Sequence, residues 1–261
     1  MFLQDPGIYY EVHGKGTSLV LLNGIMMNTL SWVEHVGRLQ DDYQLIVYDM
    51  RDQGQSGRLE PGYHISIHAE DLKRLLDHLN IKKANICGLS YGGQVALIFS
   101  LKYPELVEKL VLANTSAHVD RYLLSMGQMW KRAAQLYDGE AFFDLALISI
   151  YSRSFYNSHY DWLAKGRQLF KNFLTKEWFD GFIRLASSNE MYDVRGDLSQ
   201  IKNQTLLIAS QEDIITPYSQ MLEMSRAIVN SQIVCIPDAG HAAFLEKIDT
   251  FCTLLKGFVS K

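Results

Sequence analysis

One short segment of the chain combines a nucleophile with a local pattern that would expose it. Gly88-Leu89-Ser90-Tyr91-Gly92 follows an apolar run and leads into a helical pattern. In a sharp turn from a strand into a helix, the flanking glycines let the two elements approach closely and the central residue is strained. The pattern predicts Ser90 as an exposed nucleophile, with the start of the helix directed at an oxyanion. The alternative is a glycine-rich helix start with Ser90 as its cap.

A serine hydroxyl becomes a good nucleophile only when a base removes its proton. We predict His241 as this base, because it follows the last apolar run in a loop that leads into the final helical pattern. A carboxylate must then orient the imidazole. Asp213 is the best placed acid, with Glu212 and Asp238 as competitors. The chain order Ser, Asp, His fits a mixed α/β architecture.

The elements that would position these residues alternate along the chain. Short, nearly continuous apolar runs predict strands buried on both faces, and amphipathic stretches between them, such as residues 65–79, predict helices. The runs lie at residues 18–22, 44–48, 84–87, 110–112, 205–209 and 233–236. Such alternation predicts a mostly parallel sheet with helices on both faces and ligands at its C-terminal edge. Residues 8–14 alternate with period two and predict an antiparallel edge strand.

Residues 118–195 interrupt this alternation, because their pattern is helical throughout. They hold 16 of the chain's 30 aromatic residues and three of its four tryptophans. We therefore predict a helical lid, 118–195, inserted into a core formed by residues 1–117 and 196–261. Most of its aromatic residues would be structural, and the insertion would cover a largely apolar pocket.

Composition narrows the possible functions further. With 261 residues, 48% hydrophobic and 21% charged residues, the chain is typical of a globular protein, and its net charge of -4 offers no basic surface for nucleic acid or anionic membranes. Cys87, Cys235 and Cys252 lack the spacing of a disulfide framework or a zinc site. With no apolar run of spanning length and no visible signal peptide, we expect a cytoplasmic protein, monomeric or homodimeric.

The chain carries four motifs, in the expected order along the sequence, and through them it resembles the α/β-hydrolase superfamily over essentially its whole length. They are Gly88-Leu89-Ser90-Tyr91-Gly92, the acid loop with Asp213 and Pro217, Gly240-His241, and Tyr48-Asp49-Met50-Arg51-Asp52-Gln53-Gly54-Gln55-Ser56. Within the superfamily the chain looks most like small esterases, enol-lactonases and cofactor-free haloperoxidases. The resemblance implies an α/β-hydrolase fold with a Ser90, Asp213, His241 triad and no cofactor or metal. It also implies an oxyanion hole formed by the backbone N–H groups of Ile25 and Tyr91.

Two residues depart from the family pattern. Asn23 stands where the oxyanion loop usually has His, and we expect its side chain to form local hydrogen bonds that shape the loop. Asp52 stands where the family usually has Gly, and an altered loop conformation is the expected effect.

These observations predict a serine hydrolase acting on a small, fairly apolar ester, lactone or thioester. A C–C bond hydrolase, a perhydrolase or an aminopeptidase would use the same triad, and acidic residues such as Glu140, Asp144 and Glu190 are candidates to bind a substrate ammonium group. A receptor-like protein with slow turnover is an alternative of another class. His64 and His68 have a spacing that can suit a metal, but without a third ligand we interpret them as solvated or capping residues.

Overall fold

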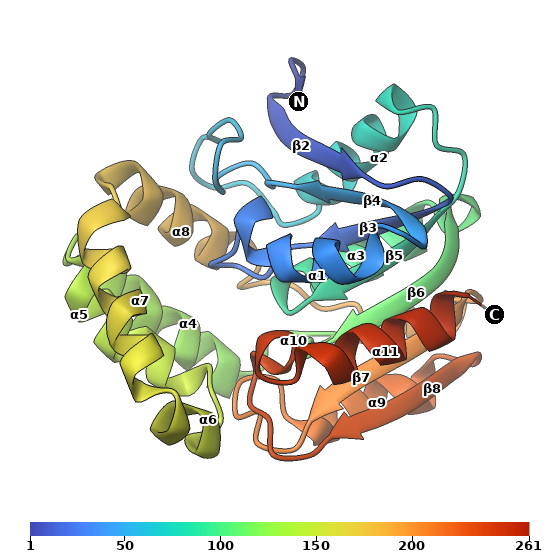
Figure 1. Ribbon diagram of the computed structural model, residues 1–261. Helices are drawn as coiled ribbons and strands as arrows, with labels where there is room; N and C mark the ends of the chain where they lie inside the picture. The colour runs from blue at the N-terminus through green and yellow to red at the C-terminus, as the bar shows by residue number, and fades with distance from the viewer. Residues whose placement is uncertain (261) are drawn as a thin grey trace.

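One eight-stranded sheet with helices on both faces forms the body of the protein (Figure 1). The computed structural model describes residues 1–260. The strands are β1 (Phe2–Leu3), β2 (Ile8–His13), β3 (Thr17–Leu22), β4 (Tyr43–Tyr48), β5 (Ala84–Leu89), β6 (Val107–Ala113), β7 (Gln204–Ser210) and β8 (Ser231–Ile236). Their spatial order is β1-β2-β4-β3-β5-β6-β7-β8. Neighbouring strands from β4 to β8 are parallel, which confirms the predicted mostly parallel sheet.

The two edges of the sheet differ from the expectation. Residues 8–13 form an antiparallel strand, but β2 is not at the edge, because the chain turns back after Leu3 and β1 pairs along its outer side. At the other edge β8 has a single neighbouring strand, and of its residues only Ile236 is buried. Ile233 and Val234 are partly buried on opposite faces of the sheet, so the predicted cover on both faces is present but incomplete.

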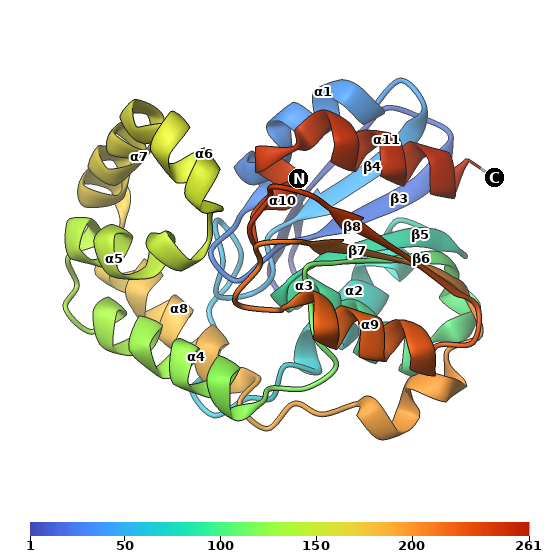
Figure 2. The same cartoon turned by 90° about the horizontal axis from the view of Figure 1, so that it is seen from below.

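Helices pack on both faces of the sheet, as predicted. The helices of the sheet layers are α1 (Val33–Leu39), α2 (Ile67–His78), α3 (Tyr91–Lys102), α9 (Tyr218–Ala227), α10 (Ala243–Glu246) and α11 (Ile248–Val259). Apolar residues of α2, α3 and α9 bury one face, and those of α1, α10 and α11 bury the other (Figure 2). Short 3-10 helices lie at η1 (Thr29–Trp32), η2 (Pro104–Leu106), η3 (Leu147–Ser149) and η4 (Arg195–Gln200). Within residues 1–260, no helix is long and apolar enough to cross a membrane.

The remaining helices lie between β6 and β7 in the sequence and stand beside the sheet in both views (Figures 1 and 2). They are α4 (Arg121–Ala134), α5 (Gly139–Ala146), α6 (Arg153–Ser158), α7 (Tyr160–Phe173) and α8 (Lys176–Ser188). We call this segment, residues 118–195, the helical insert. Its own apolar cluster contains Trp130, Phe142, Phe143, Phe179 and Phe182, so many of its aromatic residues serve packing.

The two ends of the helical insert are hydrogen-bonded to each other. The N–H of Val119 donates to the carbonyl of Tyr192 at 3.0 Å, and the N–H of Val194 donates to the carbonyl of Ala117 at 2.9 Å. His118 and Asp193 form an isolated antiparallel bridge between these bonds. We call this pairing of residues 117–119 with 192–194 the neck, since the insert leaves and rejoins the sheet through it.

Asp52, one of the two residues that depart from the family pattern, ties the helical insert to the sheet. Its φ of 72° lies in the left-handed region that favours glycine. The strain is offset by a buried ion pair, because the Arg184 guanidinium of α8 contacts both carboxylate oxygens of Asp52, with Nε at 3.1 Å from each. The side chain of Asp52 is fully buried and that of Arg184 is 17% exposed. Asp52 therefore has a structural role, which the sequence alone did not indicate.

We predict that Arg184→Met destabilises the protein by about 3 kcal/mol. Methionine retains much of the packing of the arginine stem but leaves the buried Asp52 carboxylate without its cation, and an unpaired buried charge is strongly unfavourable. The free energy of unfolding from urea denaturation at neutral pH is the measurement.

The matched control is the double variant Asp52→Gly/Arg184→Met. It removes the unpaired carboxylate and places glycine at the positive φ, so we expect its free energy of unfolding to lie within about 1 kcal/mol of the wild type. A double variant as unstable as Arg184→Met alone would contradict the assignment of the loss to the buried charge.

Candidate active site

Ser90 lies at the junction of β5 and α3, in the strained turn that the sequence predicts. Its φ of 53° and ψ of -115° are unfavourable for a residue with a side chain. The flanking glycines allow the end of β5 and the start of α3 to approach each other closely, since a Cβ on Gly88 would lie 2.4 Å from the carbonyl oxygen of Gly92. A Cβ on Gly92 would in turn lie 2.5 Å from the carbonyl oxygen of Leu22 in β3.

The structure brings the three predicted side chains together in one hydrogen-bonded row. His241 Nε2 lies 2.8 Å from Ser90 Oγ, and His241 Nδ1 lies 2.8 Å from Asp213 Oδ2. An ionised carboxylate can only accept, so Nδ1 carries the proton and Nε2 is free to accept the one on Ser90 Oγ. This is the arrangement in which a hydroxyl can lose its proton to an imidazole as it attacks.

Asp213 is buried and accepts an unusually large number of hydrogen bonds. Besides His241, its donors are Asn114 Nδ2 at 2.9 Å, Thr216 Oγ1 at 2.8 Å, and the N–H groups of Ile215 and Thr216 at 2.8 and 3.0 Å. Burial alone would raise the pKa of the Asp213 carboxyl, but attraction to His241 and the hydrogen bonds outweigh it and lower the pKa below its ordinary value. Asp213 therefore remains ionised at neutral pH.

Asn114 and Thr216 are site residues that the sequence analysis missed. Asn114 directly follows β6 and has a φ of 43°, so the polar run Asn114-Thr115-Ser116 at the C-terminal edge of the sheet was an available signal. Thr216 lies three residues after the acid in the same loop, and its Oγ1 is also 3.3 Å from His241 Nδ1.

The two competing acids do not contact the imidazole. Glu212 is exposed, and its carboxylate accepts a hydrogen bond from the N–H of Arg153 in the helical insert. Asp238 is also exposed, with a φ of 48° in the turn after β8. Of the three acids that the sequence left open, the structure places only Asp213 beside His241.

The proposed oxyanion donors, Ile25 and Tyr91, lie on segments that converge on Ser90. Tyr91 is the first residue of α3, so its N–H has no partner within the helix. Ile25 belongs to a tight turn in which the N–H of Met27 donates to the carbonyl of Gly24. Gln53 Nε2 fixes that turn by donating to the carbonyl of Gly24 at 2.8 Å. Their role as oxyanion donors remains a prediction.

Asn23 shapes the same turn through its side chain, as expected. Its Nδ2 donates to the carbonyl of Tyr48 at 3.0 Å and to Gln53 Oε1 at 3.1 Å, and its Oδ1 accepts from Trp32 Nε1 at 2.7 Å. The buried amide thus connects the ends of β3 and β4 without requiring an imidazole.

Ser90 and His241 face a cavity of about 240 Å³ between the sheet and the helical insert, which we call the main cavity. Its remaining walls are largely apolar and come from the turn at residues 24–27, the insert and α10, including Met26, Met27, Trp130, Leu147, Phe170 and Phe244. Within residues 1–260, neither lysine nor arginine lines it. The cavity therefore suits an uncharged group with little hydrogen-bonding capacity.

Glu246, on α10, joins the His241 loop to the helical insert and was also missed by the sequence analysis. Its Oε1 accepts from the N–H groups of Gly240 at 3.1 Å and Ser152 at 3.0 Å, and its Oε2 accepts from Ser152 Oγ at 2.6 Å. The N–H of Ala242 also donates to the carbonyl of Ile150 at 3.1 Å. Ala242 is thus hydrogen-bonded directly to the insert, and Gly240 is connected to it through Glu246.

The other reactive side chains considered in the sequence lie in different surroundings. His64 is exposed and its Nδ1 accepts from the N–H of Ser66, a local capping contact, as expected. His68 is fully buried, so its interpretation as solvated or capping was wrong. Burial and the charge of Arg51 lower the pKa of His68 to about 3.

Burial raises the pKa of the Cys87 thiol to about 12, in accord with an inert cysteine. Within residues 1–260, no three His, Cys, Asp or Glu side chains are grouped to hold a metal ion.

Comparisons with known proteins agree with this fold. The family model described as alpha/beta hydrolase fold matches residues 17–248. An alpha/beta hydrolase enzyme from a Medee basin deep-sea metagenome library has a crystal structure with a TM-score of 0.94 and 40% identity, covering 97% of this chain and 94% of that chain. A 3-oxoadipate enol-lactonase from Acinetobacter baylyi is 26% identical over 95% of this chain and 91% of its own length. A candidate carbamate hydrolase, RutD, from Pseudomonas syringae is 28% identical over 95% of each chain.

We predict that Gly240→Ala slows the reaction of Ser90 with a fluorophosphonate by roughly 10- to 100-fold. A Cβ on Gly240 would lie 2.4 Å from the backbone nitrogen of Ser152, so the His241 loop and the helical insert must separate. A displacement of about 1 Å between reacting groups can cost a hundredfold in rate. The measurement is the second-order rate constant of covalent labelling.

Gly257→Ala is the matched control, because a Cβ on Gly257 in α11 meets no atom within 4 Å. This variant should label at the wild-type rate, since alanine also favours the helix. If Gly240→Ala labels as fast as Gly257→Ala, the close contact at Gly240 does not position His241.

Proposed function

This chain belongs to the α/β-hydrolase family, and we propose that it is a serine hydrolase that cleaves a small, apolar carboxylic ester, lactone or thioester through an acyl-enzyme on Ser90. The observation that carries the proposal is the continuous row from Ser90 Oγ through His241 to Asp213 at the wall of an apolar cavity. No resident cofactor or metal takes part in the proposed reaction.

In the acylation step, Ser90 Oγ attacks the substrate carbonyl carbon while His241 Nε2 takes the hydroxyl proton. The Asp213 carboxylate stabilises the resulting imidazolium by accepting the hydrogen bond from His241 Nδ1–H. The carbonyl oxygen becomes an oxyanion, and we assign its two donors as the N–H groups of Ile25 and Tyr91. The imidazolium then returns the proton to the leaving oxygen or sulfur as the bond to the carbonyl carbon breaks, which leaves an ester on Ser90.

In the deacylation step, His241 Nε2 takes a proton from a water molecule, whose oxygen attacks the carbonyl carbon of the acyl-Ser90 ester. The second oxyanion accepts hydrogen bonds from the same two N–H groups. Its collapse breaks the bond to Ser90 Oγ, which recovers its proton from the imidazolium and restores the starting state. One base therefore serves both steps, and the orientation of its ring by Asp213 matters in each.

The helical insert supports a substrate with an apolar acyl group. Trp130, Leu147, Ile150 and Phe170 of the insert line the main cavity together with Ser90, so we propose that the insert acts as the cap that selects the acyl chain. The enol-lactonase relative, which by name acts on a cyclic ester, is in keeping with lactones as substrates. Lactones, esters and thioesters all remain candidate substrates, because each can form the same type of acyl-enzyme on Ser90.

An aminopeptidase activity receives no support from the insert. The acids that were candidates for binding an ammonium group already have cationic partners, since Arg167 contacts both Glu140 and Asp144 and Lys131 contacts Glu190. A substrate ammonium ion would have to displace these cations, and it would gain little from doing so.

We predict that Ser90→Ala abolishes hydrolysis of p-nitrophenyl butyrate, with kcat reduced at least about 10⁴-fold, because no other group can form the acyl-enzyme. Ser100→Ala is the matched control: Ser100 is a buried serine on α3, the helix that begins directly after Ser90, and its hydroxyl donates only to the carbonyl of Ala96. It should retain wild-type activity. A wild-type protein that binds esters without turnover and does not react with a fluorophosphonate would instead support a receptor-like role.

We also predict a preference for uncharged acyl groups over anionic ones. The mono-p-nitrophenyl ester of adipate should have a kcat/KM at least about 100-fold below that of p-nitrophenyl hexanoate, because the cavity offers its free carboxylate no cation. Initial rates at pH 7.5 provide the comparison. Equal rates would mean that the carboxylate reaches water or a cation, and they would favour an anionic lactone such as that of the 3-oxoadipate enol-lactonase.

A further inference from the structure

A second cavity lies beside the main cavity and shares a wall with it. This cavity, which we call the side cavity, has a volume of about 40 Å³, compared with roughly 10–15 Å³ for a cavity that holds a single water molecule. Its apolar lining is formed by Ile25, Val119, Leu123, Leu124, Trp130 and Ala186. Ile25 and Trp130 also line the main cavity, so these two side chains form the partition between them.

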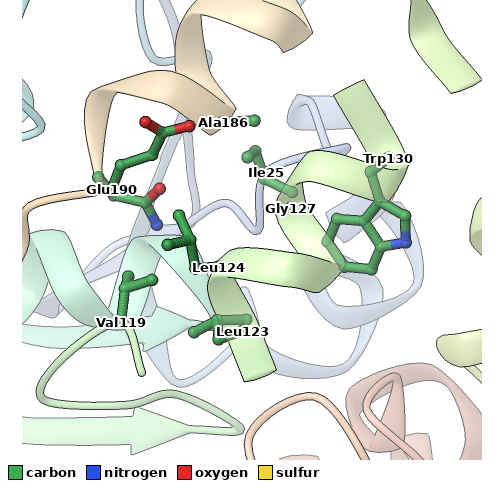
Figure 3. A pocket seen from close by; sticks show the side chains of 9 residues that line it. Ile25, Val119, Leu123, Leu124, Gly127, Trp130, Ala186 and Glu190 are labelled. Atoms are coloured by element: carbon green, nitrogen blue, oxygen red, sulfur yellow. The ribbon is translucent and has the colours of Figure 1, made fainter. Parts of the chain in front are cut away.

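Figure 3 shows how the partition is built. The indole of Trp130 projects from α4 and closes one side of the side cavity, with its Nε1 directed away from Val119 and Leu124. Ile25, from the turn at residues 24–27, and Gly127 of α4 line the same cavity. Trp130 is only 5% exposed, and within residues 1–260 its Nε1 has no hydrogen-bond partner. The ring is therefore held by packing alone.

The two polar side chains that line the side cavity, Asn189 and Glu190, already have partners. Asn189 Nδ2 donates to Gln94 Oε1 at 2.8 Å, and the carboxylate of Glu190 pairs with Lys131. Neither residue requires a polar ligand inside the cavity. The free space is therefore suited to methylene groups rather than to a second polar substrate.

We propose that Trp130 sets the upper limit on acyl chain length by closing the side cavity off from the main cavity. This inference rests on the proposed function, because it takes the main cavity as the acyl site. A straight chain bound to Ser90 ends against the Trp130 ring. With that ring removed, the chain continues between α4 and α8 into the side cavity. Trp130 is thus a specificity-determining residue and takes no part in the bond-breaking steps.

The test variant is Trp130→Leu. Leucine retains an apolar contact and a strong helix former in α4, and no hydrogen-bond partner is stranded because the indole N–H has none within residues 1–260. Trp130→Phe is a second, milder variant that preserves more of the packing. Circular dichroism and thermal melting establish that each variant is folded before its kinetics are compared.

The readout is kcat/KM across p-nitrophenyl esters from acetate to dodecanoate. Each methylene group moved from water into an apolar cavity contributes about a fourfold factor. If two or three more methylene groups fit, the ratio of decanoate to butyrate activity should rise roughly 15- to 60-fold in Trp130→Leu, with a smaller rise in Trp130→Phe. An unchanged ratio in folded, active Trp130→Leu would overturn the proposal.

Two matched variants distinguish the side cavity from a general widening of the site. Leu147 lines only the main cavity, so Leu147→Ala should widen that cavity without the long-chain gain. A Cβ on Gly127 meets no atom within 4 Å, so Gly127→Val can fill the side cavity without displacing the helix. Adding Gly127→Val to Trp130→Leu should return the chain-length ratio toward the wild-type value. An equal gain in Leu147→Ala, or persistence of the gain in the double variant, would count against the side cavity.

A binding measurement separates this proposal from the proposed function. In the Ser90→Ala background, isothermal titration calorimetry with 2-hexanone and 2-decanone reports on the cavities without any turnover. Trp130→Leu should tighten binding of 2-decanone relative to 2-hexanone by a similar 15- to 60-fold. If the wild type hydrolyses no ester but this shift appears, the proposed function fails and the partition stands; if esters are hydrolysed and the shift is absent, the partition fails alone.

Discussion

The buried carboxylate of Asp213 is the group on which the candidate site depends. Its charge would be costly in this position without the hydrogen bonds it receives from Asn114, Thr216 and the backbone of its own loop. These donors hold the carboxylate ionised and leave one oxygen in line with His241 Nδ1. The tautomer of the imidazole, and with it the ability of Nε2 to accept a proton from Ser90, follows from this one constraint.

The helical insert is fastened to the sheet close to the residues that perform the proposed chemistry. Arg184 pairs with Asp52, Ser188 is hydrogen-bonded to the Tyr91 hydroxyl at 2.7 Å, and Ser152 is hydrogen-bonded to Glu246. Tyr91 directly follows Ser90, and Glu246 also binds the backbone beside His241. The packing of the insert and the geometry of the site are therefore coupled through a few specific polar contacts.

The sequence predicted what depends on local patterns. The strand runs, the strained turn at Ser90 and the loop that carries His241 are each contained in a few consecutive residues, and parallel strands bring their ends to one edge. Asn114 and Glu246 were missed because each acts through a partner that is distant in the sequence. The role of Asp52 was hidden for the same reason, since its ion-pair partner lies 132 residues away. The burial of His68 and the partial exposure of β8 depend on the three-dimensional surroundings, which periodicity does not specify.

The neck has a consequence for how proteins of this architecture diversify. The backbone bonds between residues 117–119 and 192–194 close the insert into a loop whose two ends stay together irrespective of what lies between them. Substitutions at intervening residues that make no contact outside the insert can therefore accumulate without separating β6 from β7, which pair directly in the sheet. An evolving lineage can in this way acquire new substrates by changing cavity-lining residues within one continuous segment, provided that Arg184, Ser188 and Ser152 keep their contacts outside the insert.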